Sequence, residues 1–191
     1  FGEILKRPIG AMTALAHYKQ GWCYINKSDW LKAMDSFVQV FNNQATNSSS
    51  GEGSTVAADL KRSDVSSDAR SDVREEALVA SVQPFSELKP EELRNRPQYL
   101  KPISFYRSLA FDKSSFRKVL SRLAKRLAIK DRNAESAEAY FELMRLSDEA
   151  RDRREALESF YEKFKKAKLS NFPQQASSEV RETIRLTEEE N

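Results

Sequence analysis

The sequence predicts an all-α fold, and three observations support this prediction. Only 5 of the 191 residues are glycine, a residue that is unfavourable inside helices. Apolar side chains recur at spacings of three and four residues along much of the chain, which places them on one face of a helix. No stretch shows the regular apolar–polar alternation of a half-buried strand. We therefore expect helices that pack on one another through apolar stripes.

Residues 11–42 predict two antiparallel helices. Apolar side chains at helical spacing mark the first helix: Leu15, Tyr18, Trp22 and Ile25. A second set marks the next helix: Trp30, Leu31, Met34, Phe37, Val38 and Phe41. Ser28 or Asp29 can begin this second helix, because their side chains accept hydrogen bonds from free backbone N–H groups. The connection is only a few residues long, so the two helices must be antiparallel neighbours.

The next stretch, 43–68, has a different composition. It is rich in Ser, Gly, Asn and Asp and contains no aromatic residue. Such a segment buries too little apolar surface to offset the entropy that is lost on ordering. We expect a flexible insert; the alternative is a docking segment that becomes ordered when a partner binds.

Helical spacing returns after this insert. Pro84 is expected to end or kink the first helix, and the segment 85–97, which contains Pro90 and Pro97, is predicted to be irregular except for a short turn at PEEL. The clearest helix has an apolar stripe of Phe116, Val119, Leu120, Leu123 and Leu127. The helices predicted in this part of the chain cover 69–83, 98–110, 113–129, 134–146, 148–168 and 173–187.

The stretch YKQGWCYINKSDWLKAMDSF, residues 18–37, has the pattern of a helix-turn-helix repeat. Counted from Ala14, it has a small residue where the helices cross, an aromatic residue one turn later, and a small and an aromatic residue on the second helix: Gly21, Tyr24, Ala33 and Phe37. These offsets resemble the tetratricopeptide repeat (TPR), whose units of about 34 residues stack because one helix pair cannot bury its own face. A weaker match covers 117–147 and needs one extra residue in the turn; it rests on Leu120, Leu123, Ala124, Ala137, Phe141 and Met144.

The TPR resemblance implies a right-handed superhelical solenoid of antiparallel helix pairs. Residues 1–42 would hold the end of a preceding repeat and one helix pair, residues 43–68 the insert, and residues 69–191 further helix pairs. The chain opens on Phe1 rather than Met, so we expect a fragment or a processed chain, from which a signal peptide or a lipid anchor could have been removed.

The phrase at 18–37, the insert and the REEAL sequence at 74–78 together resemble a subset of bacterial cell-envelope TPR proteins. This resemblance implies a location in the periplasm or cell envelope, with the cytoplasm as the alternative. It also implies membership of a larger complex, in which any association with the membrane is indirect. No apolar run in the sequence is long enough to cross a bilayer.

The residues give no support to catalysis. His17 and Cys23, each the sole residue of its type, lie six residues apart and so on different faces of a helix, which does not suit a Cys–His nucleophile pair. The sequence contains no Gly-rich phosphate loop, no HExxH and no CxxC motif. The acidic residues lie beside Lys and Arg on polar helix faces, whereas general acid–base groups need burial. We expect no enzyme activity, no cofactor and no metal.

The resemblance also implies a concave binding groove, lined by the first helix of each unit. The residues at these positions are Leu15, Tyr18, Trp22, Asn26, Lys118, Ser121 and Lys125. Aromatic side chains there could anchor an apolar side chain of a partner peptide. The alternative is that Tyr18 and Trp22 pack on a preceding repeat or on the next helix. Because they replace the Lys and Asn of the carboxylate-binding TPR clamp, we do not expect an acidic C-terminal tail as the ligand.

A second candidate surface is basic. Residues 101–132 contain ten Lys or Arg but only two acidic residues, and four of the bases form a stripe: Lys118, Arg122, Lys125 and Arg126. Such a stripe can bind phosphates, anionic lipid or an acidic partner. The alternative is pairing with the acidic segment 133–164, or simple solvation. Few aromatic residues are interleaved for base stacking, so nucleic acid is not the favoured partner.

The sequence therefore predicts a non-catalytic scaffold or adaptor that binds other proteins. One alternative is a nucleic-acid or anionic-surface binder that uses the basic stripe within 113–132. Another is a structural subunit whose exposed terminal repeats pack on copies of itself or on preceding N-terminal repeats that this chain lacks.

Overall fold

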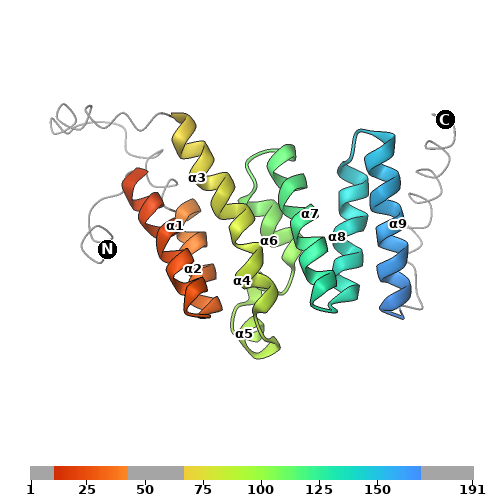
Figure 1. Cartoon of the computed structure of the whole chain (residues 1–191), viewed down its shortest axis with the longest axis horizontal. Coiled ribbons are helices and arrows are strands. Elements are labelled where there is room, and N and C mark those ends of the chain that lie inside the picture. The colour runs from red at the N-terminus through yellow and green to blue at the C-terminus, as the bar shows by residue number, and fades with distance from the viewer. Residues whose placement is uncertain (1–10, 43–66, 169–191) are drawn as a thin grey trace. The chain divides into compact units, whose positions relative to one another are not determined.

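The structure is a computed structural model that describes residues 11–42 and 67–168. Within these ranges every regular element is a helix, which confirms the all-α prediction (Figure 1). The chain divides between Asn95 and Arg96 into two compact units. The segment 43–66 and the helix predicted at 173–187 lie outside the described residues, so the three-part organisation stays a prediction.

The first unit begins with an antiparallel pair, α1 (Ala11–Asn26) and α2 (Trp30–Asn42). Ser28 in the turn has a left-handed backbone, with a φ of 56°. Asp29 follows, and its carboxylate accepts a hydrogen bond from the backbone N–H of Lys32 over 3.4 Å. Of the two caps that the sequence offers, the structure therefore uses Asp29 to begin α2.

The crossing of α1 and α2 requires glycine. A Cβ atom on Gly21 would lie 2.7 Å from Cε1 of Phe37, which is closer than two non-bonded carbon atoms can approach without a clash. Phe37 and Ala33 are fully buried on the α2 side of this contact. The small residue that the repeat pattern places at Gly21 thus has a direct packing reason.

The first unit continues with α3 (Ser67–Ala80) and α4 (Val82–Glu87), both of which pack against α2. Pro84 interrupts the helix predicted at 69–83, as the sequence suggested. The interruption lies at Ser81, and Pro84 falls in the first turn of α4. A proline ring clashes with the carbonyl four residues earlier and provides no N–H, so the chain must break before Pro84 rather than after it.

The prediction of an irregular 85–97 is only partly correct. Helix α4 extends to Glu87, and two short helices follow: α5 (Pro90–Arg94), which is the expected turn at PEEL, and the 3₁₀-helix η3 (Pro97–Tyr99). Both begin with a proline, as does α6 (Pro102–Leu109). Proline is well suited to the first helical position, because the N–H that it lacks has no partner there. These prolines therefore start helices.

The second unit holds η3, α6 and three long antiparallel helices, α7 (Lys113–Ile129), α8 (Asn133–Leu146) and α9 (Ala150–Lys166). The predicted bounds of the helix 113–129 are confirmed, and its apolar stripe is buried. Asp112 begins α7 by accepting a hydrogen bond from the backbone N–H of Ser115 over 2.6 Å. Where α7 crosses α8, the Ser136 hydroxyl donates to the Ala124 carbonyl over 2.8 Å, and both residues are fully buried. Small residues thus meet at this crossing too.

Candidate functional site

The first candidate surface lies on α1, where Tyr18 and Trp22 flank Phe37 of α2. The centroid of the Phe37 ring lies 6.0 Å from that of Tyr18 and 6.2 Å from that of Trp22, and the Trp22 ring meets Phe37 edge-on. Tyr18 and Trp22 also contact each other edge-on over 6.4 Å. Such edge contacts are favourable and hold the two rings in defined orientations.

These aromatic side chains are only partly covered. Trp22 is 37% exposed, Leu15 and Tyr18 are half-buried, and Asn26 is exposed. One side of each ring, Tyr18 and Trp22, therefore packs on Phe37 of the next helix, which is one of the two alternatives that the sequence left open to a groove. The other side of Trp22 stays accessible, so a rigid aromatic side chain is held at the surface beside Asn26.

Helix α3 completes the surroundings of this surface. Burial raises the pKa of Tyr18, and its hydrogen bond with Glu76 adds to that shift. The Arg74 guanidinium of α3 lies 5.7 Å from the ring centroid of Phe41. Phe41 lies near the C-terminal end of α2, away from the turn that joins α1 and α2. Ala77 and Leu78 are fully buried, so the REEAL sequence at 74–78 joins α3 to the first helix pair. Its role in the structure is packing.

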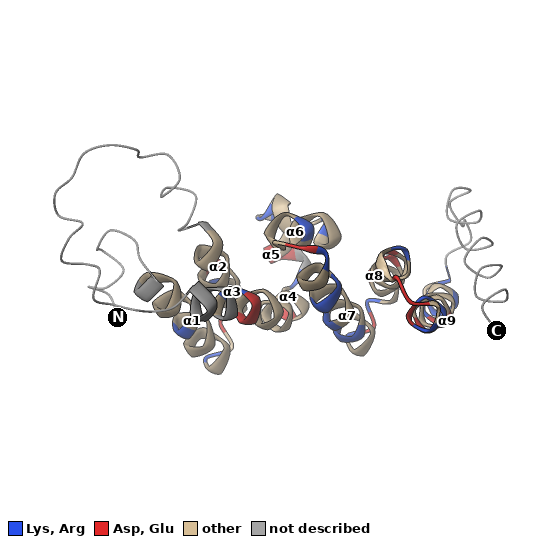
Figure 2. Cartoon of the chain, turned by 90° about the horizontal axis from the view of Figure 1, so that it is seen from above, with Lys and Arg blue, Asp and Glu red and all other residues tan. Residues whose placement is uncertain are grey.

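The second candidate surface lies on α7. Of the residues that the sequence places there, Lys118, Arg122 and Lys125 are exposed, whereas Ser121 and Arg126 are half-buried. Figure 2 shows Lys and Arg along α7 with no acidic residue among them. The two candidate surfaces belong to different units, since α1 lies in the first unit and α7 in the second.

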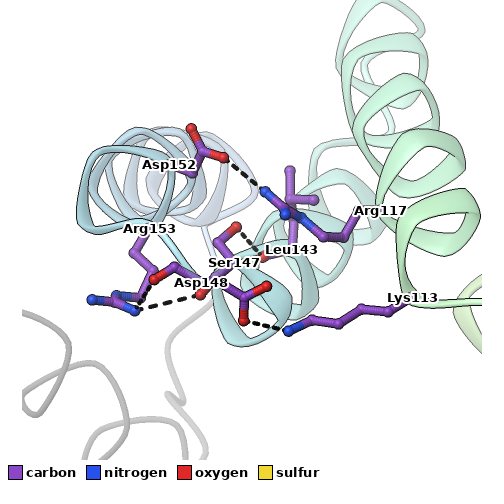
Figure 3. Close-up of polar contacts among 7 residues, drawn as sticks. All are labelled: Lys113, Arg117, Leu143, Ser147, Asp148, Asp152 and Arg153. Atoms are coloured by element: carbon purple, nitrogen blue, oxygen red, sulfur yellow. Dashed lines mark hydrogen bonds and ion pairs between the residues drawn. The ribbon is translucent and has the colours of Figure 1, made fainter.

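Two other bases of α7 pair with acids that lie 35 positions further along the chain. Arg117 contacts Asp152 over 2.7 Å, Lys113 pairs with Asp148, and in each pair the residues are 35 positions apart. Figure 3 shows both side chains extending from α7 toward the start of α9. The hydrogen bond from Lys113 lowers the pKa of the Asp148 carboxyl below its usual value. The expected internal pairing therefore accounts for one side of α7.

A third pair with the same spacing lies deeper. Glu142 of α8 is buried and pairs with Arg107 of α6, 35 positions earlier, and with Arg145 over 3.2 Å. The Arg107 guanidinium also lies 5.1 Å from the ring centroid of Phe116. The sequence places Glu142 in the acidic segment 133–164 but does not predict its burial or its pairing with Arg107. A base and an acid 35 positions apart, as in the two pairs of α7, are the signal that could have identified this pair.

His17 and Cys23, the two side chains weighed as a nucleophile pair, lie in surroundings that show no sign of a reactive site. His17 is half-buried, which lowers the pKa of its imidazole, and Cys23 is exposed. Within 11–42 and 67–168 no group of His, Cys, Asp and Glu side chains is placed to hold a metal ion. In the same ranges no helix is both long and apolar enough to span a bilayer.

The chain was compared with protein families, curated proteins and solved structures. No protein-family model, no curated protein and no solved structure matches the chain. The resemblance to the TPR consequently remains a prediction from the sequence.

Proposed function

We propose that this protein is a non-catalytic scaffold or adaptor, built from TPR-like helix pairs, that binds another protein through the exposed face of α1. The observation that carries the proposal is Trp22. Its ring is fixed edge-on against Phe37, yet it is 37% exposed. An orientated, accessible tryptophan loses little conformational entropy on binding, and tryptophan is among the residues that contribute most to protein interfaces.

Two kinds of contact support the TPR-like part of the proposal. Helix pairs of both units cross at small residues, Gly21 in one and Ala124 with Ser136 in the other. In the second unit, ion pairs between residues 35 positions apart recur three times. A constant offset close to 34 residues is typical of stacked repeats in which each helix contacts its counterpart in the next repeat.

The partner is a protein, and it would contribute an apolar side chain that packs beside Trp22. The resemblance at 18–37 and 74–78 favours a place in a larger complex of the bacterial envelope, with the cytoplasm as the alternative. Fractionation of cells that carry the untagged full-length protein tests the location. Recovery in the cytoplasmic fraction alone would contradict an envelope assignment.

The binding proposal is tested by comparing Trp22→Ala with Tyr161→Ala. Tyr161 is the matched control, since it is an aromatic residue of similar exposure, at 44%, on a helix of the other unit. A protein captured from the source organism in moderate salt would be purified and its affinity measured for each variant. We expect Trp22→Ala to weaken binding about tenfold or more and Tyr161→Ala to leave it unchanged.

Circular dichroism of each variant checks that the fold is intact. Equal binding by Trp22→Ala and the unchanged protein would contradict the proposal. So would loss of helix on substitution of Trp22, because that would make its role structural.

A further inference from the structure

One end of the helices α7, α8 and α9 is rich in bases. Consecutive helices are antiparallel, so α7 and α9 finish at the end where α8 begins (Figure 1). The pKa of Lys166, in the last turn of α9, is raised by its hydrogen bond with Glu162 and also by the charge of Asp131, in the turn between α7 and α8. The end of α9 and this turn are therefore close enough for their charges to interact. We call residues 122–135 and 162–168 the basic end.

The basic end contains nine bases and three acids. Its α7 side, with the turn and the start of α8, carries five bases and two acids: Arg122, Lys125, Arg126, Lys130 and Arg132 against Asp131 and Glu135. Its α9 side carries four bases and one acid: Lys163, Lys165, Lys166 and Lys168 against Glu162. The next acid along α8, Glu138, lies three residues further from this end. Even if each acid neutralises one base, six positive charges remain.

Helix dipoles do not account for this surplus. Bases are favourable at a helix C-terminus, which carries about half a negative charge, and the N-terminus carries about half a positive charge. The two C-termini and the one N-terminus at the basic end together amount to about half a negative charge. A single base would offset that charge.

Contacts between the helices do not account for it either. At the opposite end of the same helices, Lys113 and Arg117 of α7 form ion pairs that reach the turn before α9 and its first turn (Figure 3). At the basic end, Glu135 and Glu162 pair only with bases at most four positions away in the chain. Such local pairs on the surface contribute little to the packing of one helix on another. The charge of this end therefore suits an anionic partner outside the chain.

An exposed aliphatic side chain stands among these bases. Ile129, the last residue of α7, is 71% exposed, more than any other large hydrophobic side chain of the described residues. Lys125 lies one turn before it and Lys130 directly after it, and both are exposed. The one aromatic residue of the basic end, Phe164, is half-buried, so the end offers no ring for base stacking. An accessible aliphatic side chain among bases instead suits the boundary between lipid headgroups and acyl chains.

We propose that the basic end binds the surface of an anionic lipid bilayer. Ile129 enters the boundary of the acyl chains, and the exposed bases contact the headgroups, Lys125 from α7 and Lys165 and Lys168 from α9. Each base close to an anionic surface strengthens binding about fivefold, and an inserted apolar side chain adds a second, independent contribution. The helices stand with one end on the membrane, which leaves their sides accessible. This inference does not depend on the role proposed for α1, which lies in the other unit.

Sedimentation of the purified full chain with lipid vesicles tests the inference. In about 0.05 M salt the protein should bind vesicles of phosphatidylcholine with about 30% phosphatidylserine, and it should be released in about 0.5 M salt. Vesicles of phosphatidylcholine alone should bind it far more weakly. The variant K125E/K165E should bind the anionic vesicles about twentyfold more weakly or worse. The control K19E/R151E changes the net charge equally, at exposed sites on α1 and at the opposite end of α9, and should bind normally.

Substitutions of Ile129 test the inserted side chain separately from the charge. Ile129→Ser removes apolar surface and should weaken binding to the anionic vesicles about fivefold or more. Ile129→Phe adds apolar surface and should strengthen binding. Because Ile129 is exposed, neither change disturbs the core, and circular dichroism checks that the helices are intact. A gain of binding in one variant and a loss in the other cannot come from unfolding.

Four results would overturn the inference. The first is a full chain that does not bind anionic vesicles in low salt, whether or not it binds a single-stranded oligonucleotide. The second is an equal loss of binding in K125E/K165E and K19E/R151E, which would make the attraction one of net charge alone. The third is vesicle binding that neither substitution of Ile129 alters. The fourth is displacement from vesicles by about 10 mM inorganic phosphate at constant ionic strength, which would indicate a discrete phosphate site.

Discussion

The two units achieve the same task, holding helices side by side, with different side chains. In the first unit, the α1–α2 contact is aromatic and depends on the absence of a side chain at Gly21. In the second unit, α7 and α9 are joined by ion pairs such as Arg117 with Asp152, above a core that contains Leu123 and Leu127. The first unit should therefore respond mainly to changes in volume, and the second should also respond to changes in charge.

This comparison can be followed in one sample. Both tryptophans, Trp22 and Trp30, lie in the first unit, so intrinsic tryptophan fluorescence reports on that unit alone. Circular dichroism reports on the helices of both. Differences between the two signals during urea unfolding separate effects on one unit from effects on the other.

The largest effect is expected from Gly21→Ala. The new methyl group would overlap the ring of Phe37, which is fully buried. Overpacking should outweigh the gain in helix propensity and lower the free energy of unfolding of the first unit by about 1–2 kcal/mol. The fluorescence transition should move to lower urea.

The same substitution in a Phe37→Leu background checks the cause. With the ring removed, the methyl group has space, and alanine should then stabilise the helix relative to glycine. A destabilisation of equal size in both backgrounds would contradict the role assigned to the ring of Phe37.

A smaller effect is expected from Glu142→Gln. Glu142 is buried between Arg107 and Arg145, whose side chains are about half exposed, so solvent screens part of the loss. The second unit should lose about 1 kcal/mol. The circular dichroism transition should shift while the fluorescence transition does not. A shift of the fluorescence transition by the same amount would mean that the two units unfold together.

The smallest effect is a dependence on pH. The pKa of Asp148 in the folded protein is lowered by its hydrogen bond with Lys113. A lowered folded-state pKa adds stability above the unfolded value of 3.8, and this stability is lost as the pH falls through the folded pKa. Asp148→Asn should therefore be slightly less stable than the unchanged protein at pH 7, with a difference that shrinks below about pH 4. A difference that grows on acidification would contradict this sign.

The sequence predicted what depends on periodicity and on local caps. The bounds of α7 and the burial of its stripe follow from spacing along one helix, and the small residue where α1 and α2 cross, Gly21, was expected from the repeat pattern of the helix pair. The turns at Pro90 and Pro97 were harder to interpret, because a proline that breaks one helix is also suited to start the next.

Contacts between distant side chains could not be predicted in the same way. The charge balance of 133–164 suggested that α7 would be partly neutralised, but only the structure shows that Lys113 and Arg117 are paired while Arg122 and Lys125 are exposed. The difference is one of rotation about the helix axis. Packing of α7 against several neighbouring helices fixes that rotation. The apolar pattern of α7 alone does not determine how the helix packs on each neighbour.

The spacing of the ion pairs between α7 and α9 has a mechanical consequence. Lys113 and Arg117 are separated by one helical turn of α7, and their partners lie close together in the chain, Asp148 in the turn before α9 and Asp152 in the first turn of α9, so a small displacement of α9 along α7 weakens both pairs together. Under a force directed along the helix axes, the second unit should consequently lose both ion pairs in one step rather than one after the other.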